Sequence, residues 1–289
     1  MKSFLLSAIL FGVALIASCS TPSKSDDPAL ESPYLGQKPP SSIPEPFAPG
    51  IVTTKGYEYG GVFTPDLEEF YFIRNNTESN KHELVIFRVK DGQWEESEIF
   101  PRRGTHIFSP DGSIMHLGGR FMERNDNGWS ELKSLSVPFE NLPIMRLSSS
   151  KYGTYYFDEF KRDLTGSIRF SRKVNGQYEE PKLIGKTINT GQSFHPFIAP
   201  DESYIIFDSK RENGQGDSDL YISYRQNDGA WGKAINLGEK INTEAWEAGA
   251  SITSDGKYMF FNRNMGSKSY ENVDIFWVSA GFIKELRNN

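Results

Sequence analysis

One turn recurs five times along this chain, and each copy precedes a short run of aromatic and β-branched residues. The turn positions are 66, 111, 151, 201 and 255, so neighbouring copies lie 40 to 54 residues apart. Four copies are Thr64-Pro65-Asp66, Ser109-Pro110-Asp111, Ala199-Pro200-Asp201 and Thr253-Ser254-Asp255, and the third carries Lys151 where the others carry aspartate. A repeat of about 40–50 residues is typical of β-propellers, in which each repeat forms one blade.

The residue types fit strands joined by tight turns. Proline presets the backbone of a turn, aspartate caps it through its own side chain, and the aromatic residues that follow suit a half-buried strand. A second turn of the Asn-Gly or Asp-Gly type recurs within the repeats, and such pairs favour two-residue hairpins. Its copies are Asp91-Gly92, Asn127-Gly128, Asn175-Gly176 and Asp228-Gly229. Each repeat therefore predicts four antiparallel strands, and the chain is predicted to be all-β.

The best-formed repeat runs from Ala199 to Trp231 and contains Phe207-Asp208-Ser209-Lys210-Arg211 and Asp219-Leu220-Tyr221. These residues resemble the WD-like repeats of the TolB-type β-propeller superfamily. The resemblance implies a propeller, and five repeats favour five blades, with the six of TolB itself as the alternative. It leaves function open, because the superfamily includes scaffolds, peptidase accessory domains, lyases and lactonases.

The segment from Pro46 to Thr54 resembles the end of a repeat without its beginning. We expect it to supply the outer strand of the last blade and so to close the ring, leaving no exposed sheet edge.

The N-terminus predicts a lipid anchor. Lys2 precedes an apolar run from Phe4 to Ile16, which is too short to span a bilayer and is typical of a signal peptide. Ile16-Ala17-Ser18-Cys19 resembles the bacterial lipobox, in which the cysteine is acylated. We therefore expect a signal peptide over residues 1–18, a lipidated flexible tether over 19–45 and a propeller over 46–289. By resemblance to lipoprotein sorting, Ser20 favours the outer membrane of the cell envelope.

Composition limits the partners and cofactors. The formal net charge of -6 argues against nucleic acid, because phosphate binding needs a basic face. The four histidines are scattered without metal-ligand spacing, and Cys19 is the one cysteine of the sequence. We expect no cofactor. The alternative is a calcium ion held by the oxygens of Asp208, Asp217 and Asp219, a loop that solvation would also explain.

Candidate ligand-binding residues lie where the first two strands of a blade meet one mouth of the channel. Positions counted back from the turns place charged and aromatic side chains there in several repeats. The predicted ligand-binding residues are Glu58, Arg74, His195, Trp246, Glu247 and Arg263. Carboxylates, a histidine, arginines and aromatic rings suit a sugar acid or an anionic peptide end. A wet polar channel, whose Arg–Glu pairs close contacts between blades, is the alternative.

Two classes of function fit this sequence. One is a non-catalytic envelope lipoprotein that binds a protein or glycan through the propeller mouth. The other is a hydrolase or lyase acting on a carbohydrate or lactone in the central funnel. The sequence does not decide whether the protein is an enzyme, because a catalytic base must lie within reach of its substrate.

Overall fold

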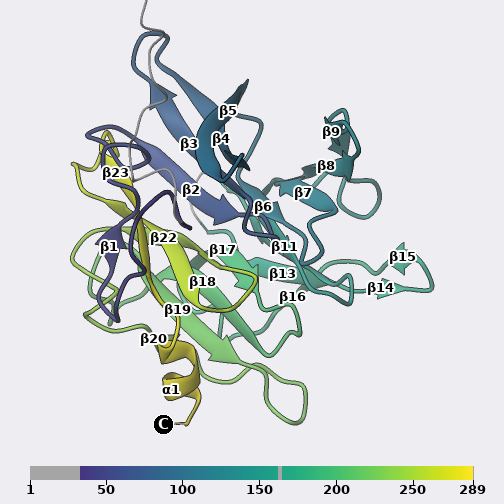
Figure 1. Ribbon diagram of the computed structural model, residues 1–289. Coiled ribbons are helices and arrows are strands. Elements are labelled where there is room, and N and C mark those ends of the chain that lie inside the picture. The colour runs from purple at the N-terminus through teal and green to yellow at the C-terminus, as the bar shows by residue number, and fades with distance from the viewer. Residues whose placement is uncertain (1–32, 162–164, 289) are drawn as a thin grey trace, which may run out of the picture.

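The computed structural model describes residues 33–161 and 165–288. Five antiparallel sheets follow one another around a ring (Figure 1). Blade 1 contains β2 (Glu58–Phe63), β3 (Glu69–Asn76), β4 (Lys81–Lys90) and β5 (Gln93–Pro101). Blade 2 contains β6 (His106–Phe108), β7 (Ile114–Leu117), β8 (Arg120–Asn125) and β10 (Lys133–Ser134), with β9 (Gly128–Trp129) paired to the end of β8. The predicted all-β propeller with five blades is confirmed.

The remaining blades follow the same order. Blade 3 contains β11 (Ile144–Ser149), β12 (Tyr155–Glu159), β13 (Ile168–Ser171) and β16 (Lys182–Leu183), and β14 (Lys173–Val174) and β15 (Gln177–Tyr178) form a small separate hairpin. Blade 4 contains β17 (Gln192–Ile198), β18 (Tyr204–Lys210), β19 (Asp219–Tyr224) and β20 (Ile235–Asn236). Blade 5 contains β21 (Glu247–Ile252), β22 (Tyr258–Asn264), β23 (Val273–Ser279) and β1 (Glu45–Pro46), and helix α1 (Phe282–Asn288) follows it.

The ring closes through the N-terminal segment. Strand β1 pairs with β23 and so becomes the outermost strand of blade 5. The strand comprises only Glu45 and Pro46, shorter than the predicted segment, because the chain then turns and Pro49 forms an isolated bridge with Thr53.

The segment before β1 also packs on the ring. Leu35 is buried in the core, and the Tyr34 ring lies 5.4 Å from that of Trp277. The prediction of a flexible tether over residues 19–45 was therefore too long at its C-terminal end. The Gln37 side chain also holds this segment, since it donates to the Pro46 carbonyl and accepts the Ala48 N–H, and composition alone did not show these contacts.

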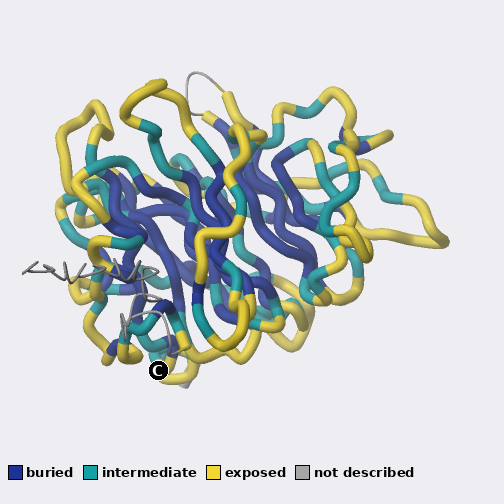
Figure 2. The backbone as a smooth tube through the Cα atoms, turned by 45° about the horizontal axis from the view of Figure 1, so that its top comes forward, coloured by how far each residue is buried: buried dark blue, intermediate teal, exposed yellow. Residues whose placement is uncertain are grey.

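The predicted aspartate caps are present in the turns. Asp255 Oδ1 accepts hydrogen bonds from Thr253 Oγ1 at 2.7 Å and from the Lys257 N–H at 3.1 Å. In the third repeat, which lacks this aspartate, the Ser150 hydroxyl oxygen accepts the Tyr152 N–H at 3.2 Å instead. Figure 2 shows the buried residues running along the strands, with exposed residues concentrated in the loops between them.

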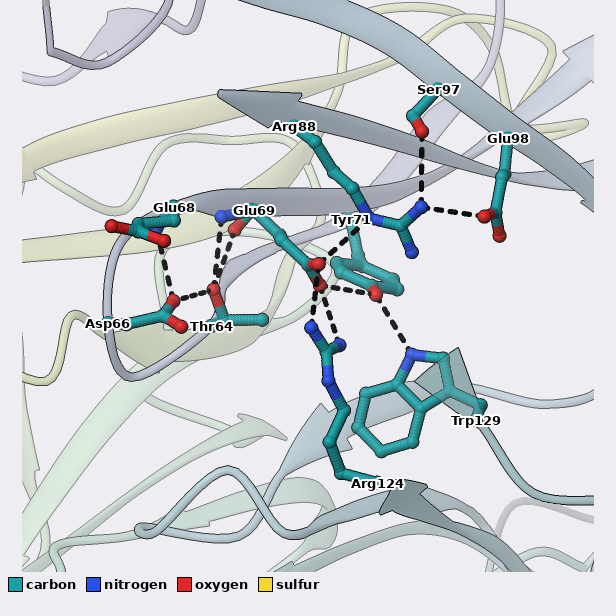
Figure 3. A network of polar contacts seen from close by, with 10 residues as sticks. All are labelled: Thr64, Asp66, Glu68, Glu69, Tyr71, Arg88, Ser97, Glu98, Arg124 and Trp129. Carbon is teal, nitrogen blue, oxygen red and sulfur yellow. Dashed lines mark hydrogen bonds and ion pairs between the residues drawn. The ribbon is translucent and has the colours of Figure 1, made fainter. Parts of the chain in front are cut away.

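Blades 1 and 2 are joined by a polar cluster around Glu69, shown in Figure 3. The Glu69 carboxylate accepts hydrogen bonds from Arg88, from two nitrogens of Arg124 and from the Tyr71 hydroxyl. That hydroxyl in turn accepts Trp129 Nε1–H at 2.9 Å. Because the donors come from both blades, the cluster fixes one blade against the other.

Candidate functional site

A cavity of about 880 Å³ opens at the mouth of the channel. Its walls come from the first strand of every blade or from the residue just before that strand: Tyr59, Thr105, Met145, His195 and Trp246. The cavity therefore lies where the five blades meet, which is where a propeller can offer a ligand several side chains at once.

Aromatic rings form much of the cavity wall. The six are Tyr57, Tyr59, Phe160, Phe194, Trp246 and Tyr270. The Tyr59 ring lies 6.2 Å from the ring of Tyr57 and 6.2 Å from that of Trp246, with interplanar angles of 18° and 25°. Tyr270 meets Trp246 edge to face at 5.4 Å. Tyr57, Tyr59 and Trp246 therefore form a nearly parallel row, with Tyr270 packed edge to face against Trp246, so the wall is preorganised before any ligand arrives.

The cavity is more positive than the rest of the protein. Its lining includes Arg102, Lys210 and Lys268, whereas its carboxylates are Asp208 and Asp217. Lys210 Nζ pairs with Asp217 at 3.2 Å, and the Arg102 guanidinium lies 5.9 Å from the centre of the Tyr59 ring. The chain as a whole has a formal charge of -6. A local excess of cations on an acidic protein attracts anionic ligands to this mouth.

His195 lines the cavity in an unusual backbone conformation. Its φ is 47°, in the left-handed region that residues with a side chain rarely adopt. It lies within the bulge between β17 and β18, and the same positions of blades 1 and 5 hold Gly60 and Gly249. Glycine adopts this conformation without strain. Strain retained for a particular side chain is typical of functional positions.

The imidazole of His195 is held by Asp208. Nδ1 lies 2.9 Å from Oδ1 and 3.1 Å from Oδ2 of this carboxylate, which is almost fully buried. Asp208 Oδ1 also accepts the backbone N–H of Gly249 at 3.0 Å. Because Nδ1 faces Asp208, Nε2 is the ring nitrogen left for a ligand in the cavity.

Two further buried charged residues, Asp158 and Arg146, adjoin His195. Asp158 accepts the backbone N–H of His195 at 2.9 Å and that of Arg146 at 2.8 Å. The side chain of Arg146 crosses the channel and donates to the carbonyl of Ala250 at 2.8 Å. We call Arg146, Asp158, His195 and Asp208 the channel group; each is at least nine-tenths buried.

The channel group sets the protonation of His195. Burial lowers the pKa of His195, but Asp208 and Asp158 more than offset this and raise the pKa above its ordinary value of 6.5. A protonated His195 donates from both ring nitrogens, and Nε2 is the one that is not directed at Asp208.

The six predicted binding residues do not gather at one place. His195 and Trp246 line the cavity. Glu247 is fully buried, and its carboxylate accepts Thr243 Oγ1–H at 2.6 Å, the Thr243 N–H at 3.0 Å and Arg263 Nε–H at 2.8 Å. Arg263 also donates to the Ile241 carbonyl. These two charges hold the loop before β21 and are not part of the cavity wall.

Glu58 and Arg74 of blade 1 are also engaged elsewhere. Glu58 accepts Thr54 Oγ1–H at 2.7 Å and the Thr54 N–H at 3.1 Å, repeating the Thr–Glu contact of blade 5. Arg74 pairs with Glu96 at 2.8 Å. The predicted convergence of these residues on one mouth is therefore corrected: Glu58 and Glu247 recur because each holds the loop that leads into its own blade, blade 1 or blade 5.

Sequence reasoning missed several residues of the site. Tyr59 and Asp208 line it, and the buried Asp158 and Arg146 adjoin His195. One sequence pattern could have revealed the carboxylates, since Asp158 and Asp208 each lie seven residues after the turn position of their repeat. Arg146 and Tyr59 could not be found this way, because the bulge in the first strand changes which side chains face the channel.

The three aspartates considered for calcium have separate protein partners. Asp208 binds His195 and Asp217 pairs with Lys210, while Asp219 accepts the N–H groups of Gln215 and Gly216. Across residues 33–161 and 165–288, side chains of His, Cys, Asp and Glu do not form a group of three or more that could hold a metal ion.

Cys19 and the predicted signal peptide lie outside the described residues. Within the described ranges, no helix is both long and apolar enough to cross a bilayer.

Comparisons with known proteins give similarity at low identity. No family model and no curated protein matches the chain. Among solved structures, TolB from Acinetobacter baumannii is similar with a TM-score of 0.45 and 13% identity over 78% of this chain, which spans 57% of the length of TolB. A GH62 hydrolase in complex with xylotriose has a TM-score of 0.47 and 7% identity, covering 82% of this chain and 97% of its own. A gluconolactonase from Xanthomonas campestris has a TM-score of 0.46 and 8% identity, covering 84% and 98%.

Proposed function

We propose that this protein binds a glycan in the channel cavity and that lipid on Cys19 holds it in the cell envelope, at the outer membrane. The observation that carries the proposal is the row of rings formed by Tyr57, Tyr59 and Trp246. Sugar rings present apolar C–H faces that pack on aromatic side chains, and their hydroxyl groups need hydrogen-bond partners nearby. Arg102, Lys210 and His195 supply such partners in the same cavity.

The size of the cavity favours a glycan over a protein partner. Small-molecule sites typically enclose about 300–1,000 Å³. A volume of about 880 Å³ falls within that range and suits a short oligosaccharide. A folded protein would instead need a broad interacting face outside a cavity of this size.

Calorimetric titration tests glycan binding. Neutral and acidic mono- to trisaccharides are titrated into the wild type, Trp246→Ala and Tyr152→Ala. Trp246→Ala removes part of the aromatic wall and should weaken binding about tenfold or more, since a well-packed aromatic contact contributes about 1–3 kcal/mol.

Tyr152→Ala is the matched control, because Tyr152 is an aromatic residue that is 63% exposed and lies outside the cavity. This variant should keep wild-type affinity. If none of the saccharides binds the wild type, or if both variants bind equally well, the proposal is wrong.

A second candidate function is a hydrolase or lyase acting on a carbohydrate or lactone. The pair formed by His195 and Asp208 favours it, because a histidine oriented by a carboxylate is suited to proton transfer. Prolonged incubation of the protein with the saccharides and with sugar lactones, followed by chromatography, separates the two functions. Products that form with wild type and not with His195→Gly would indicate an enzyme.

A further inference from the structure

The charges around the cavity point to the chemistry of its ligand. Three of its lining residues are Arg102, Lys210 and Lys268, and the exposed aspartate among them, Asp217, is already paired with Lys210. Asp208 is 1% exposed and turned toward His195. The Lys210–Asp217 and His195–Asp208 pairs each join one cationic or titratable group to one carboxylate, so Arg102 and Lys268 are the lining cations without a carboxylate of the lining beside them. A neutral sugar does not require this arrangement.

His195 is the group best placed to receive a negative charge. Asp208 contacts Nδ1 with both oxygens, and Asp158 binds the backbone N–H of the same residue, so the ring is fixed at two points. A ring held in this way presents Nε2 in one direction. Hydrogen bonds to charged groups are shorter and stronger than neutral ones, so an imidazolium here would favour a carboxylate.

Blade 5 has no histidine at the position that His195 occupies in blade 4. It holds Gly249 where blade 4 holds His195, and Asn262 where blade 4 holds Asp208. Asn262 accepts the Gly60 N–H at 2.7 Å, just as Asp208 accepts the Gly249 N–H at 3.0 Å. The backbone contact between blades therefore requires neither a carboxylate nor a histidine. The charged pair in blade 4 exceeds what the fold needs.

We propose that the cavity takes an acidic sugar whose carboxylate accepts a hydrogen bond from Nε2 of protonated His195, so that binding weakens when His195 loses its proton. This inference rests on the proposed glycan binding and adds the charge of the glycan. The charged and titratable groups packed around His195 are Asp208, Asp158, Arg146 and Tyr59. Asp208 and Asp158 stabilise the imidazolium, and Arg146 opposes it.

The pH dependence follows from the sign of this coupling. His195 is protonated below its pKa, so affinity for an acidic sugar is highest there and falls as pH rises through that pKa. A neutral sugar gains little from the imidazolium, and its affinity should stay nearly constant. Loss of a hydrogen bond between charged groups should weaken binding about tenfold or more.

The first experiment is calorimetric titration of glucuronic acid, galacturonic acid and their oligomers between pH 5.5 and 8.5, with glucose and cellotriose as neutral counterparts. Wild type should bind the acidic sugars at least about tenfold more weakly at the upper pH. Asp208→Asn lowers the pKa of His195, so its loss of affinity should begin at lower pH. His195→Gly, with the residue found in blades 1 and 5, should show weak binding of acidic sugars without pH dependence.

The second experiment follows the His195 imidazole by nuclear magnetic resonance. Binding and protonation are reciprocally linked, so a saturating acidic sugar should raise the pKa of His195 and a neutral sugar should not. A merely structural histidine would keep the same pKa with either sugar.

The outcomes separate the two proposals. Binding of neutral and acidic sugars with equal affinity at every pH would overturn the acidic-sugar inference and leave glycan binding intact. Absence of binding by any sugar at any pH would overturn both. The double variant His195→Gly with Asp208→Asn guards against misfolding, because it reproduces the Gly249 and Asn262 pair that blade 5 already contains.

Discussion

Replacing Glu69 by glutamine should destabilise the protein by an amount that depends on pH. The carboxylate is 8% exposed and accepts hydrogen bonds from Arg88 Nε at 2.8 Å, from Arg124 Nη1 and Nη2 at 2.8 Å each, and from the Tyr71 hydroxyl at 2.7 Å (Figure 3). Burial acts to raise the pKa of Glu69, but these donors outweigh it and lower the pKa from 4.5 to about 2. The ionised Glu69 carboxylate is therefore much more stable, relative to its protonated form, in the folded state than in the unfolded state.

The size of the effect follows from this pKa. One pKa unit corresponds to about 1.4 kcal/mol, so a change from 4.5 to about 2 corresponds to about 3 kcal/mol. Arg88 and Arg124 are 25% and 35% exposed, and solvent screens their charges, so we expect about 2–3 kcal/mol. Because the folded pKa is depressed, this contribution is present above pH 4.5 and is lost as pH falls toward 2.

Urea unfolding of wild type and Glu69→Gln at pH 7, 5 and 3 measures the contribution. The difference in unfolding free energy should be about 2–3 kcal/mol at pH 7 and should shrink between pH 5 and 3. Glu96→Gln is the control. Glu96 forms an ion pair with Arg74, and the Glu96 side chain is 38% exposed. Exposed ion pairs contribute about 0–1 kcal/mol. A Glu69→Gln difference that stays constant with pH, or that is no larger than the control, would refute the reasoning.

Three further predictions concern the anchor, the turns and the channel. Cys19→Ala should abolish incorporation of labelled fatty acid and release the protein from the membrane fraction; continued labelling would contradict the lipoprotein proposal. Asp201→Ala and Asp255→Ala should each lower the unfolding free energy by about 1 kcal/mol through lost turn hydrogen bonds, with ligand affinity of the folded protein unchanged. The double variant His195→Gly with Asp208→Asn should have the same unfolding free energy in urea as wild type to within about 1 kcal/mol, because glycine relieves the left-handed backbone strain. The double variant should also be more stable than His195→Gly alone, because that single variant leaves the buried Asp208 carboxylate without its ring partner.

Much of the fold could be predicted from local chemistry. The turn aspartates act on the backbone within two residues of themselves, as Asp255 does with the Lys257 N–H, so their effect can be read from the sequence. Ring closure was also predictable, because an unfinished repeat at one end of the chain implies a partner at the other. The length of that closing strand was not, since only Glu45 and Pro46 keep the register of β23 before the chain turns away.

The site was harder to predict because it depends on a bulge. In blade 4 the register between β17 and β18 shifts between Phe194 and Phe197, so residues on the two sides of the shift face different directions. Simple alternation along the strand then fails. Counting from the turns predicted both His195 and Glu247 at the channel mouth. His195 lines the cavity, whereas Glu247 contacts Thr243 and Arg263 instead.

Comparing equivalent positions of the blades distinguishes residues that stabilise the fold from residues that can bind a ligand. The contact from threonine to glutamate recurs in blades 1 and 5, as Thr54 with Glu58 and Thr243 with Glu247, so it belongs to the architecture. Differences between blades at one position are the more informative feature, and they occur at the bulge. There glycine would suit the backbone, yet blade 4 carries His195 at a φ of 47°. Backbone strain at this position in blade 4, where blades 1 and 5 carry glycine, indicates that the His195 side chain serves something other than folding. The cavity beside His195 is where we expect that function.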